Sequence, residues 1–187
     1  MKLSGEAFDR VIEVCPGSLL DVGCGDGLYL SGFRSHGIDA VGLDIKPPAD
    51  FVGDYLSSDV GLYDCIWSSH VLEHQLDVHR FLVKCFSDLR MGGLLSITVP
   101  PLKHELVGGH LTLWNEGLLV YNLILAGFDC RHARVGVYGY NLSVLVEKSP
   151  VDMPDLKFDF GDIEVLSEYF PWPVVHGVDG RLGGVNW

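Results

Sequence analysis

The sequence predicts an α/β fold: a doubly wound, mostly parallel sheet of seven strands that ends in an antiparallel hairpin. Short apolar runs typical of buried strands alternate along the chain with segments whose apolar residues recur at helical spacing. Such alternation indicates a parallel sheet with helices on its faces. The last two apolar runs are separated only by residues 138–141, so they are expected to pair as a hairpin. The chain of 187 residues is long enough for one domain with a sizeable core.

The first half of the chain carries signals for two helices and four strands. Ser4 is expected to cap the first helix, which Pro16 and Gly17 stop. Asp26 is expected to cap the second helix, which ends near Gly37 because glycine suits the position after a helix. Strands are expected at residues 18–22, 40–44, 51–54 and 62–67.

The second half carries signals for two long helices, three strands and one short helix. Asp77 and Asn115 are expected to cap the long helices. Gly92 with Gly93 ends the first of them, and Gly127 ends the second. Strands are expected at residues 94–99, 130–137 and 142–147, and the short helix at about 162–169.

Composition and charge disfavour several classes of partner. The 13 basic and 25 acidic residues give a formal net charge of −12, which repels phosphate backbones and anionic membrane surfaces. We therefore expect no nucleic acid as a partner. We also expect no membrane insertion, because the sequence has no uninterrupted apolar run of membrane length. The five cysteines are odd in number and form no C-x-x-C pair, which indicates a reducing, cytoplasmic setting.

A glycine-rich turn directly after the first expected strand is the strongest functional signal. Residues 19–27 read Leu-Leu-Asp-Val-Gly-Cys-Gly-Asp-Gly. Glycine tolerates a positive φ and leaves no Cβ in the way of a nucleotide-like ligand. A dinucleotide fingerprint needs a third glycine where Leu28 stands, and no Gly-Lys-Ser/Thr follows as in a P-loop. Asp26 is poorly placed for a pyrophosphate but suits a ligand that carries an ammonium group.

The stretch from Asp21 to Gly27 resembles motif I of class I S-adenosylmethionine (SAM)-dependent methyltransferases. The resemblance covers about residues 15–148, includes the Met-Gly-Gly-Leu turn at 91–94, and agrees with the Rossmann-like element order of that family. The chain is similar to the coenzyme Q methyltransferase-like group. The resemblance implies SAM as cofactor, a small-molecule or saccharide acceptor, and residues 1–150 as the SAM-binding methyltransferase domain.

The resemblance also implies cofactor-binding residues at the carboxyl ends of the strands, where open α/β sheets bind ligands. Asp44 would accept hydrogen bonds from both ribose hydroxyls, Asp54 would bind the adenine amino group, and Asp21 would hold the methionyl ammonium. Ser68 and Ser69 are expected to follow the fourth strand and to line the methionine end of the site. The full expected set is Asp21, Gly23, Cys24, Gly25, Gly27, Asp44, Ile45, Asp54, Tyr55, Ser68 and Ser69.

Residues 70–74, His-Val-Leu-Glu-His, match the H-x-x-E-H pattern of inverted zinc peptidases. In that interpretation His70 and His74 bind zinc, Glu73 is the base, and Glu105 is one possible third ligand. Two observations oppose it. The pattern lies just after a strand of a nucleotide-binding topology, and the same string resembles one in methyltransferases of the coenzyme Q group. We therefore expect no metal.

The candidate catalytic residues are histidines. The loop at 100–114 follows the fifth strand and carries His104 and His110. We favour His110 as general base because in similar proteins a histidine precedes the helix that here begins near Asn115. His70 is the alternative, and a purely structural role stays open for each of them.

Three functions from different classes remain open. The first is O-methylation of a small-molecule or saccharide hydroxyl. The second is a non-catalytic SAM-binding module. The third is an NAD-dependent oxidoreductase, which Leu28 disfavours.

Residues 151–187 form an aromatic-rich extension outside the resemblance. They are expected to pack on the core, over the active site, or against a second subunit, so a homodimer is possible. Trp172 and Trp187 should be covered or in use, since exposed apolar patches of this kind are a liability. Aromatic faces suit sugar rings, and the acidic surface suits a neutral, hydroxyl-rich acceptor.

Overall fold

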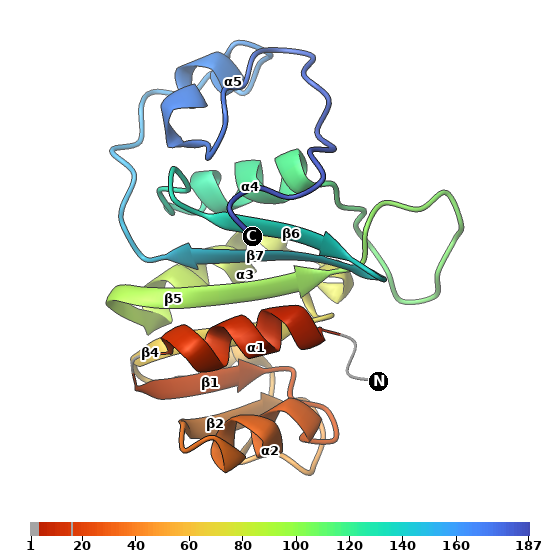
Figure 1. Ribbon diagram of the computed structural model, residues 1–187, viewed down its shortest axis with the longest axis vertical. Helices are drawn as coiled ribbons and strands as arrows, with labels where there is room; N and C mark the ends of the chain where they lie inside the picture. The colour runs from red at the N-terminus through yellow and green to blue at the C-terminus, as the bar shows by residue number, and fades with distance from the viewer. Residues whose placement is uncertain (1–3, 16) are drawn as a thin grey trace.

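The computed structural model describes residues 4–15 and 17–187, and it contains one seven-stranded sheet with the order β3-β2-β1-β4-β5-β7-β6 (Figure 1). Strands β1 to β5 are mutually parallel, whereas β7 runs antiparallel to both β5 and β6. The predicted fold class is therefore confirmed. The strands are β1 Ser18–Val22, β2 Asp39–Asp44, β3 Phe51–Val52, β4 Tyr63–Ser69, β5 Leu89–Val99, β6 Arg134–Tyr138 and β7 Asn141–Glu147.

Helices cover both faces of the sheet. The α-helices are α1 Gly5–Val14, α2 Leu28–Ser35, α3 Val78–Asp88, α4 Glu116–Leu125 and α5 Asp162–Val165. Helices α1 and α2 lie on one face, and α3 and α4 lie on the other (Figure 1). Under α1 and α2 the buried core includes Phe8, Phe33 and Trp67, whose rings contact one another. The opposite face buries a larger cluster that also takes in residues after position 150.

Two of the four predicted helix caps are confirmed. The side chain of Asp77 accepts a hydrogen bond from Arg80 N, and that of Asn115 accepts one from Leu118 N. The Ser4 hydroxyl instead contacts the Ser69 hydroxyl at 2.7 Å and caps nothing, although Ser4 does precede α1. The N-cap of helix α2 is Gly27, in a left-handed conformation, rather than the predicted Asp26, although Asp26 Oδ1 accepts a hydrogen bond from Leu28 N at 3.3 Å.

Several predicted boundaries are wrong by a few residues. Strand β4 continues through Ser69, since β5 pairs with it that far. Helix α3 ends at Asp88, before Gly92, because Leu89 already pairs with Tyr63 of β4 as part of β5. Residues 130–133 form a turn before β6, and the expected helix at 162–169 splits into α5 and a 3₁₀ turn, Ser167–Tyr169. Pro16 lies outside the described residues.

The segment after residue 150 lies over α4 and returns to the sheet (Figure 1). Phe170 is 5% exposed and stacks on Tyr121 of α4 with 6.3 Å between ring centroids. A carboxylate oxygen of Glu116, the first residue of α4, accepts hydrogen bonds from the backbone N–H groups of Leu182 and Gly183, both at 3.1 Å. These contacts attach the segment to the domain over much of its length.

The last residue closes this attachment. The Trp187 ring stacks on Tyr138 of β6, and its Nε1 donates a hydrogen bond to Glu6 of α1 at 3.0 Å. It packs so closely on Gly136 that a Cβ there would overlap the indole. The end of the chain thereby connects the sheet edge to the first helix.

Two further expectations concern the environment of the chain. Within residues 4–15 and 17–187, no helix combines the length and apolar character needed to cross a bilayer. All five cysteines are in the free thiol form, and four of them are buried.

Candidate functional site

A cavity of about 340 Å³ lies at the carboxyl ends of the parallel strands, beside the point where the strand order reverses between β1 and β4. This is the edge at which open α/β sheets bind their ligands. The sequence predicted cofactor-binding residues at this edge. The cavity is lined by Val22, Gly23, Leu43, Asp44, Ile45, Gly53, Asp54, Tyr55, His70, Val71, His74, Gln75 and Phe81.

The glycines in the turn after β1 differ in what the surrounding structure allows at each position. At Gly23 the φ angle is +77° and a Cβ would overlap the Val71 side chain, so both conformation and space require glycine. At Gly25 the φ angle is +54°, but no heavy atom lies within 4 Å of where a Cβ would be. The space beside Gly25 is thus left open by the protein itself.

Asp44, at the end of β2, connects the glycine turn to the cavity. Its Oδ2 accepts a hydrogen bond from Gly25 N at 2.9 Å, and its Oδ1 accepts one from Lys46 N at 3.0 Å. Each carboxylate oxygen has more than one acceptor site, so hydroxyl groups of a ligand can still bind. The Oδ1 of Asp54 accepts a hydrogen bond from Leu56 N at 3.1 Å, and Asp54 lines the cavity.

Asp21 is a buried carboxyl group without a matching cation. It is 2% exposed, and its Oδ2 accepts no hydrogen bond within the described part of the chain. Burial, with a smaller contribution from the charge of Asp44, raises the pKa of Asp21 to about 8. A neutral carboxyl group at this edge would ionise when a ligand brings a positive charge.

Other members of the expected set, Asp21 and Gly25 among them, do not line this cavity. Ser68 and Ser69 lie within β4 rather than after it. The Ser68 side chain is fully buried, and the Ser69 hydroxyl is engaged by Ser4. Cys24 is 7% exposed, and burial raises the pKa of its thiol to about 11. Gly27 lines a separate hollow beside α2.

His70 is held from both sides. It has a φ angle of +58°, its Nε2 lies 2.9 Å from Asn141 Oδ1, and its Nδ1 lies 3.2 Å from a carboxylate oxygen of Glu73. Burial lowers the pKa of His70, but the contacts with Glu73 and Asn141 outweigh it and raise the pKa overall. Because both ring nitrogens already face an acceptor, His70 offers no free lone pair.

A second cavity of about 280 Å³ lies in the loop after β5, and both His104 and His110 line it. Tyr140, from the β6–β7 hairpin, also lines it and stacks on His70 with 6.1 Å between ring centroids. The rings of His74 and His110 are 5.1 Å apart. These two ring pairs join the linings of the two cavities. No signal in the sequence points to Tyr140, because its approach to His70 depends on how the β6–β7 hairpin folds over.

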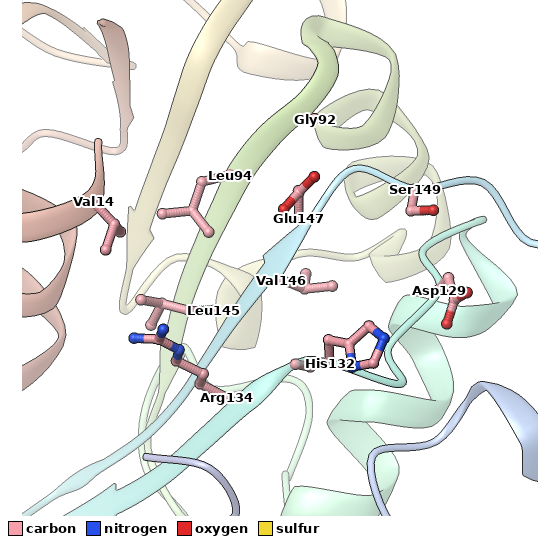
Figure 2. A pocket seen from close by; sticks show the side chains of 11 residues that line it. Val14, Gly92, Leu94, Asp129, His132, Arg134, Leu145, Val146, Glu147 and Ser149 are labelled. Atoms are coloured by element: carbon pink, nitrogen blue, oxygen red, sulfur yellow. The ribbon is translucent and has the colours of Figure 1, made fainter. Parts of the chain in front are cut away.

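A larger cavity, of about 580 Å³, lies near the opposite ends of the strands (Figure 2). It is lined by residues such as Val14, Leu94 and Arg134, and by none of the expected cofactor-binding or catalytic residues. The candidate site therefore comprises the two smaller, adjoining cavities.

The fold and the site define a Rossmann-like domain with a ligand-binding edge at its topological switch point. Residues 5–128 match the family model described as a methyltransferase domain, and the chain belongs to that family. It is 29% identical over 99 residues to a ubiquinone biosynthesis O-methyltransferase of Bradyrhizobium sp. (strain ORS 278). That match covers 43% of this chain and 38% of the relative, so the chain matches about two fifths of the relative's length.

Two solved structures share the fold. The first is the 1,6-didemethyltoxoflavin-N1-methyltransferase of Burkholderia thailandensis, solved with 1,6-didemethyltoxoflavin and S-adenosylhomocysteine bound. It has a TM-score of 0.65 at 18% identity, over 78% of this chain and 80% of that one. The second is a SAM-dependent methyltransferase of Archaeoglobus fulgidus, with a TM-score of 0.62 at 17% identity, over 77% and 94% of the two chains.

Proposed function

We propose that this protein transfers the methyl group of S-adenosylmethionine to a hydroxyl group of a small-molecule or saccharide acceptor. The observation that carries the proposal is the cavity at the carboxyl ends of β1, β2 and β4, where Asp44 presents a carboxylate that also accepts a hydrogen bond from the neighbouring Gly25 N–H. Membership of the methyltransferase domain family supports the same reaction. The acceptor class is supported by relatives whose names refer to small molecules.

The cofactor would be bound by charge and by backbone. Asp44 would accept hydrogen bonds from the ribose hydroxyls, and Asp54 with the Tyr55 N–H would bind adenine. Asp21 would pair with the methionyl ammonium, which would supply the cation that its buried Oδ2 lacks. Such charge-assisted hydrogen bonds contribute roughly 1.5–3 kcal/mol each. The turn containing Gly23, Cys24, Gly25 and Gly27 would contact the ligand through its backbone.

The reaction would be an in-line displacement. The acceptor oxygen attacks the methyl carbon, and the carbon–sulfur bond breaks with its electron pair moving to sulfur. Holding the two reactants in line can supply roughly 7–11 kcal/mol of the barrier. A histidine base would take the hydroxyl proton and add about 10²–10⁴-fold. His110 is the favoured base, since it lines the second cavity and its side chain is partly exposed.

The test is calorimetry followed by turnover. SAM is expected to bind and NAD is not; selective binding of NAD would refute the proposal. The bound protein is then incubated with pools of hydroxylated metabolites and saccharides, and release of S-adenosylhomocysteine is measured. Binding of SAM without release in any pool would instead indicate a non-catalytic SAM-binding module.

A further inference from the structure

The carboxylate of Glu73 is buried between histidines and is not fully compensated. Glu73 is 0% exposed, and its Oε1 lies 3.2 Å from His70 Nδ1 and 3.9 Å from His74 Nε2. Its Oε2 has no hydrogen-bond partner within the described residues. Burying a carboxylate costs several kcal/mol unless a cation accompanies it. His70 Nδ1 faces Oε1 from one side, so a further cation would approach the carboxylate from the side of His74 and of the unpartnered Oε2.

His74 is oriented with its free nitrogen toward that carboxylate. Its Nδ1 lies 2.7 Å from the carbonyl oxygen of Gly109, so Nδ1 carries the proton and donates it. In the neutral ring Nε2 then bears a lone pair that faces Glu73 Oε1. A metal ion between these two acceptors, which lie 3.9 Å apart, would take a lone pair from each. A backbone carbonyl behind an imidazole is the usual second-shell support of a metal ligand.

His110 supplies a third ligand atom from a distant part of the chain. One ligand atom from each of Glu73, His74 and His110 lies within 4.8 Å of the others. The approach is fixed by backbone, because Leu111 N donates a hydrogen bond to the Glu73 carbonyl oxygen at 2.7 Å. The loop after β5 is thereby attached to the 3₁₀ turn Leu72–His74 on both sides of His110.

We propose that Glu73, His74 and His110 bind one divalent metal ion of the zinc class. Two imidazoles and one carboxylate form a ligand set that zinc uses where a coordination position stays open to a substrate or water. Imidazole ligands disfavour Mg²⁺ and Ca²⁺, which prefer oxygen. The set differs from the His70–His74 pair of the peptidase pattern, and the proposal departs from the expectation, drawn from the sequence, that the protein holds no metal.

The ion would lie where it could take part in the proposed methyl transfer, and its catalytic role therefore rests on the proposed function. His74 lines the cavity assigned to the cofactor, and His110 lines the cavity of the loop after β5. An acceptor hydroxyl in the open position would have a lowered pKa and would release its proton to water before attacking the methyl carbon. While the ion is bound, His110 is a ligand and does not act as the base.

Binding of the metal alone tests the site. The full chain is freed of metal with a chelator and titrated with Zn²⁺ by calorimetry, and separately with Co²⁺ by visible absorption. One ion per chain and the intense bands of four-coordinate Co²⁺ are expected. His74→Ala and His110→Ala should each weaken binding at least about tenfold. Glu73→Gln keeps the shape of the side chain and should weaken binding likewise, with its melting temperature measured to verify folding.

Matched controls are His104→Ala, in the same loop but outside the cluster, and His79→Ala, exposed on α3. Both should bind metal like the parent protein. Absence of saturable binding, or equal affinity in His110→Ala and His104→Ala, overturns the site. SAM binding is measured in parallel without metal. Its failure would refute the proposed function and leave the metal result standing.

Discussion

The carboxylate of Asp44 accepts a hydrogen bond from the backbone N–H of Gly25 at 2.9 Å, which ties the end of β2 to the glycine turn after β1. The two features from which the cofactor site was inferred are therefore one structural unit. A change in either should affect both the geometry of the turn and the ligand.

Asp44→Ala is expected to weaken SAM binding by about tenfold or more, because charge-assisted hydrogen bonds to the ribose contribute roughly 1.5–3 kcal/mol. Calorimetry gives the dissociation constant directly. Asp39→Ala is the control, since Asp39 is exposed at the opposite end of β2. An unchanged constant in the Asp44 variant would refute the ribose assignment.

Gly25→Val is expected to abolish SAM binding by filling the open space beside the turn. A β-branched residue at a φ angle of +54° is also strained, so part of the effect would be conformational. Gly37→Val separates the two causes: Gly37 has a φ angle of +80°, equally open surroundings, and a place at the end of α2. Similar melting temperatures with SAM binding lost only in the Gly25 variant assign the loss to ligand space. Retained binding would make the turn structural only.

The features that could be predicted from the sequence were those that depend on residues close together in the chain. The caps Asp77 and Asn115 act within three residues of themselves, and the strand-turn-helix around Gly25 is contiguous. Contacts between distant segments were not predictable. Asn141 reaches His70 across 71 positions, and Glu116 reaches Leu182 across 66. The contact of Ser69 with Ser4 could not be predicted for the same reason, since the two residues are 65 positions apart.

The protonation of Asp21 should make stability depend on pH. Burial raises its pKa to about 8 in the folded protein, against 3.8 for an aspartate exposed to water. Between about pH 4 and pH 8 the unfolded chain binds fewer protons at this position than the folded one, so Asp21 lowers stability progressively as pH rises. Asp21→Asn removes this dependence. The variant should therefore gain in melting temperature relative to the parent from pH 4 to pH 8, whereas Asp39→Asn should not. A constant difference across that range would contradict the raised pKa.

His110→Ala is expected to lower kcat by at least about a hundredfold with SAM affinity nearly unchanged, as for loss of a general base. The measurement is made on chelated protein and again with saturating Zn²⁺. Loss in the chelated state identifies the base, and loss confined to the Zn²⁺-loaded state identifies the metal ligand. If His104→Ala or His70→Ala instead lowers kcat by about a hundredfold, the choice of His110 as base is wrong, but the proposed methyl transfer is unaffected. A fall in SAM affinity alone would make His110 a residue of the pocket wall.

The extension at residues 151–187 is expected to be required for folding, because it buries Leu166 and Phe170 against the core and covers α4. Phe170→Ala should cost about 3 kcal/mol of unfolding free energy, as for an aromatic side chain removed from a core. Phe160→Ala is the matched control: Phe160 is 72% exposed in the same segment, and its removal should change stability by less than about 0.5 kcal/mol. Urea unfolding followed by circular dichroism measures both.

Deletion of residues 151–187 should then leave a chain without a cooperative transition. A truncated protein that folds and binds SAM but does not methylate would show that the extension recognises the acceptor. A folded protein that changes from dimer to monomer would show that it forms a subunit interface, and full activity would refute every role assigned to it.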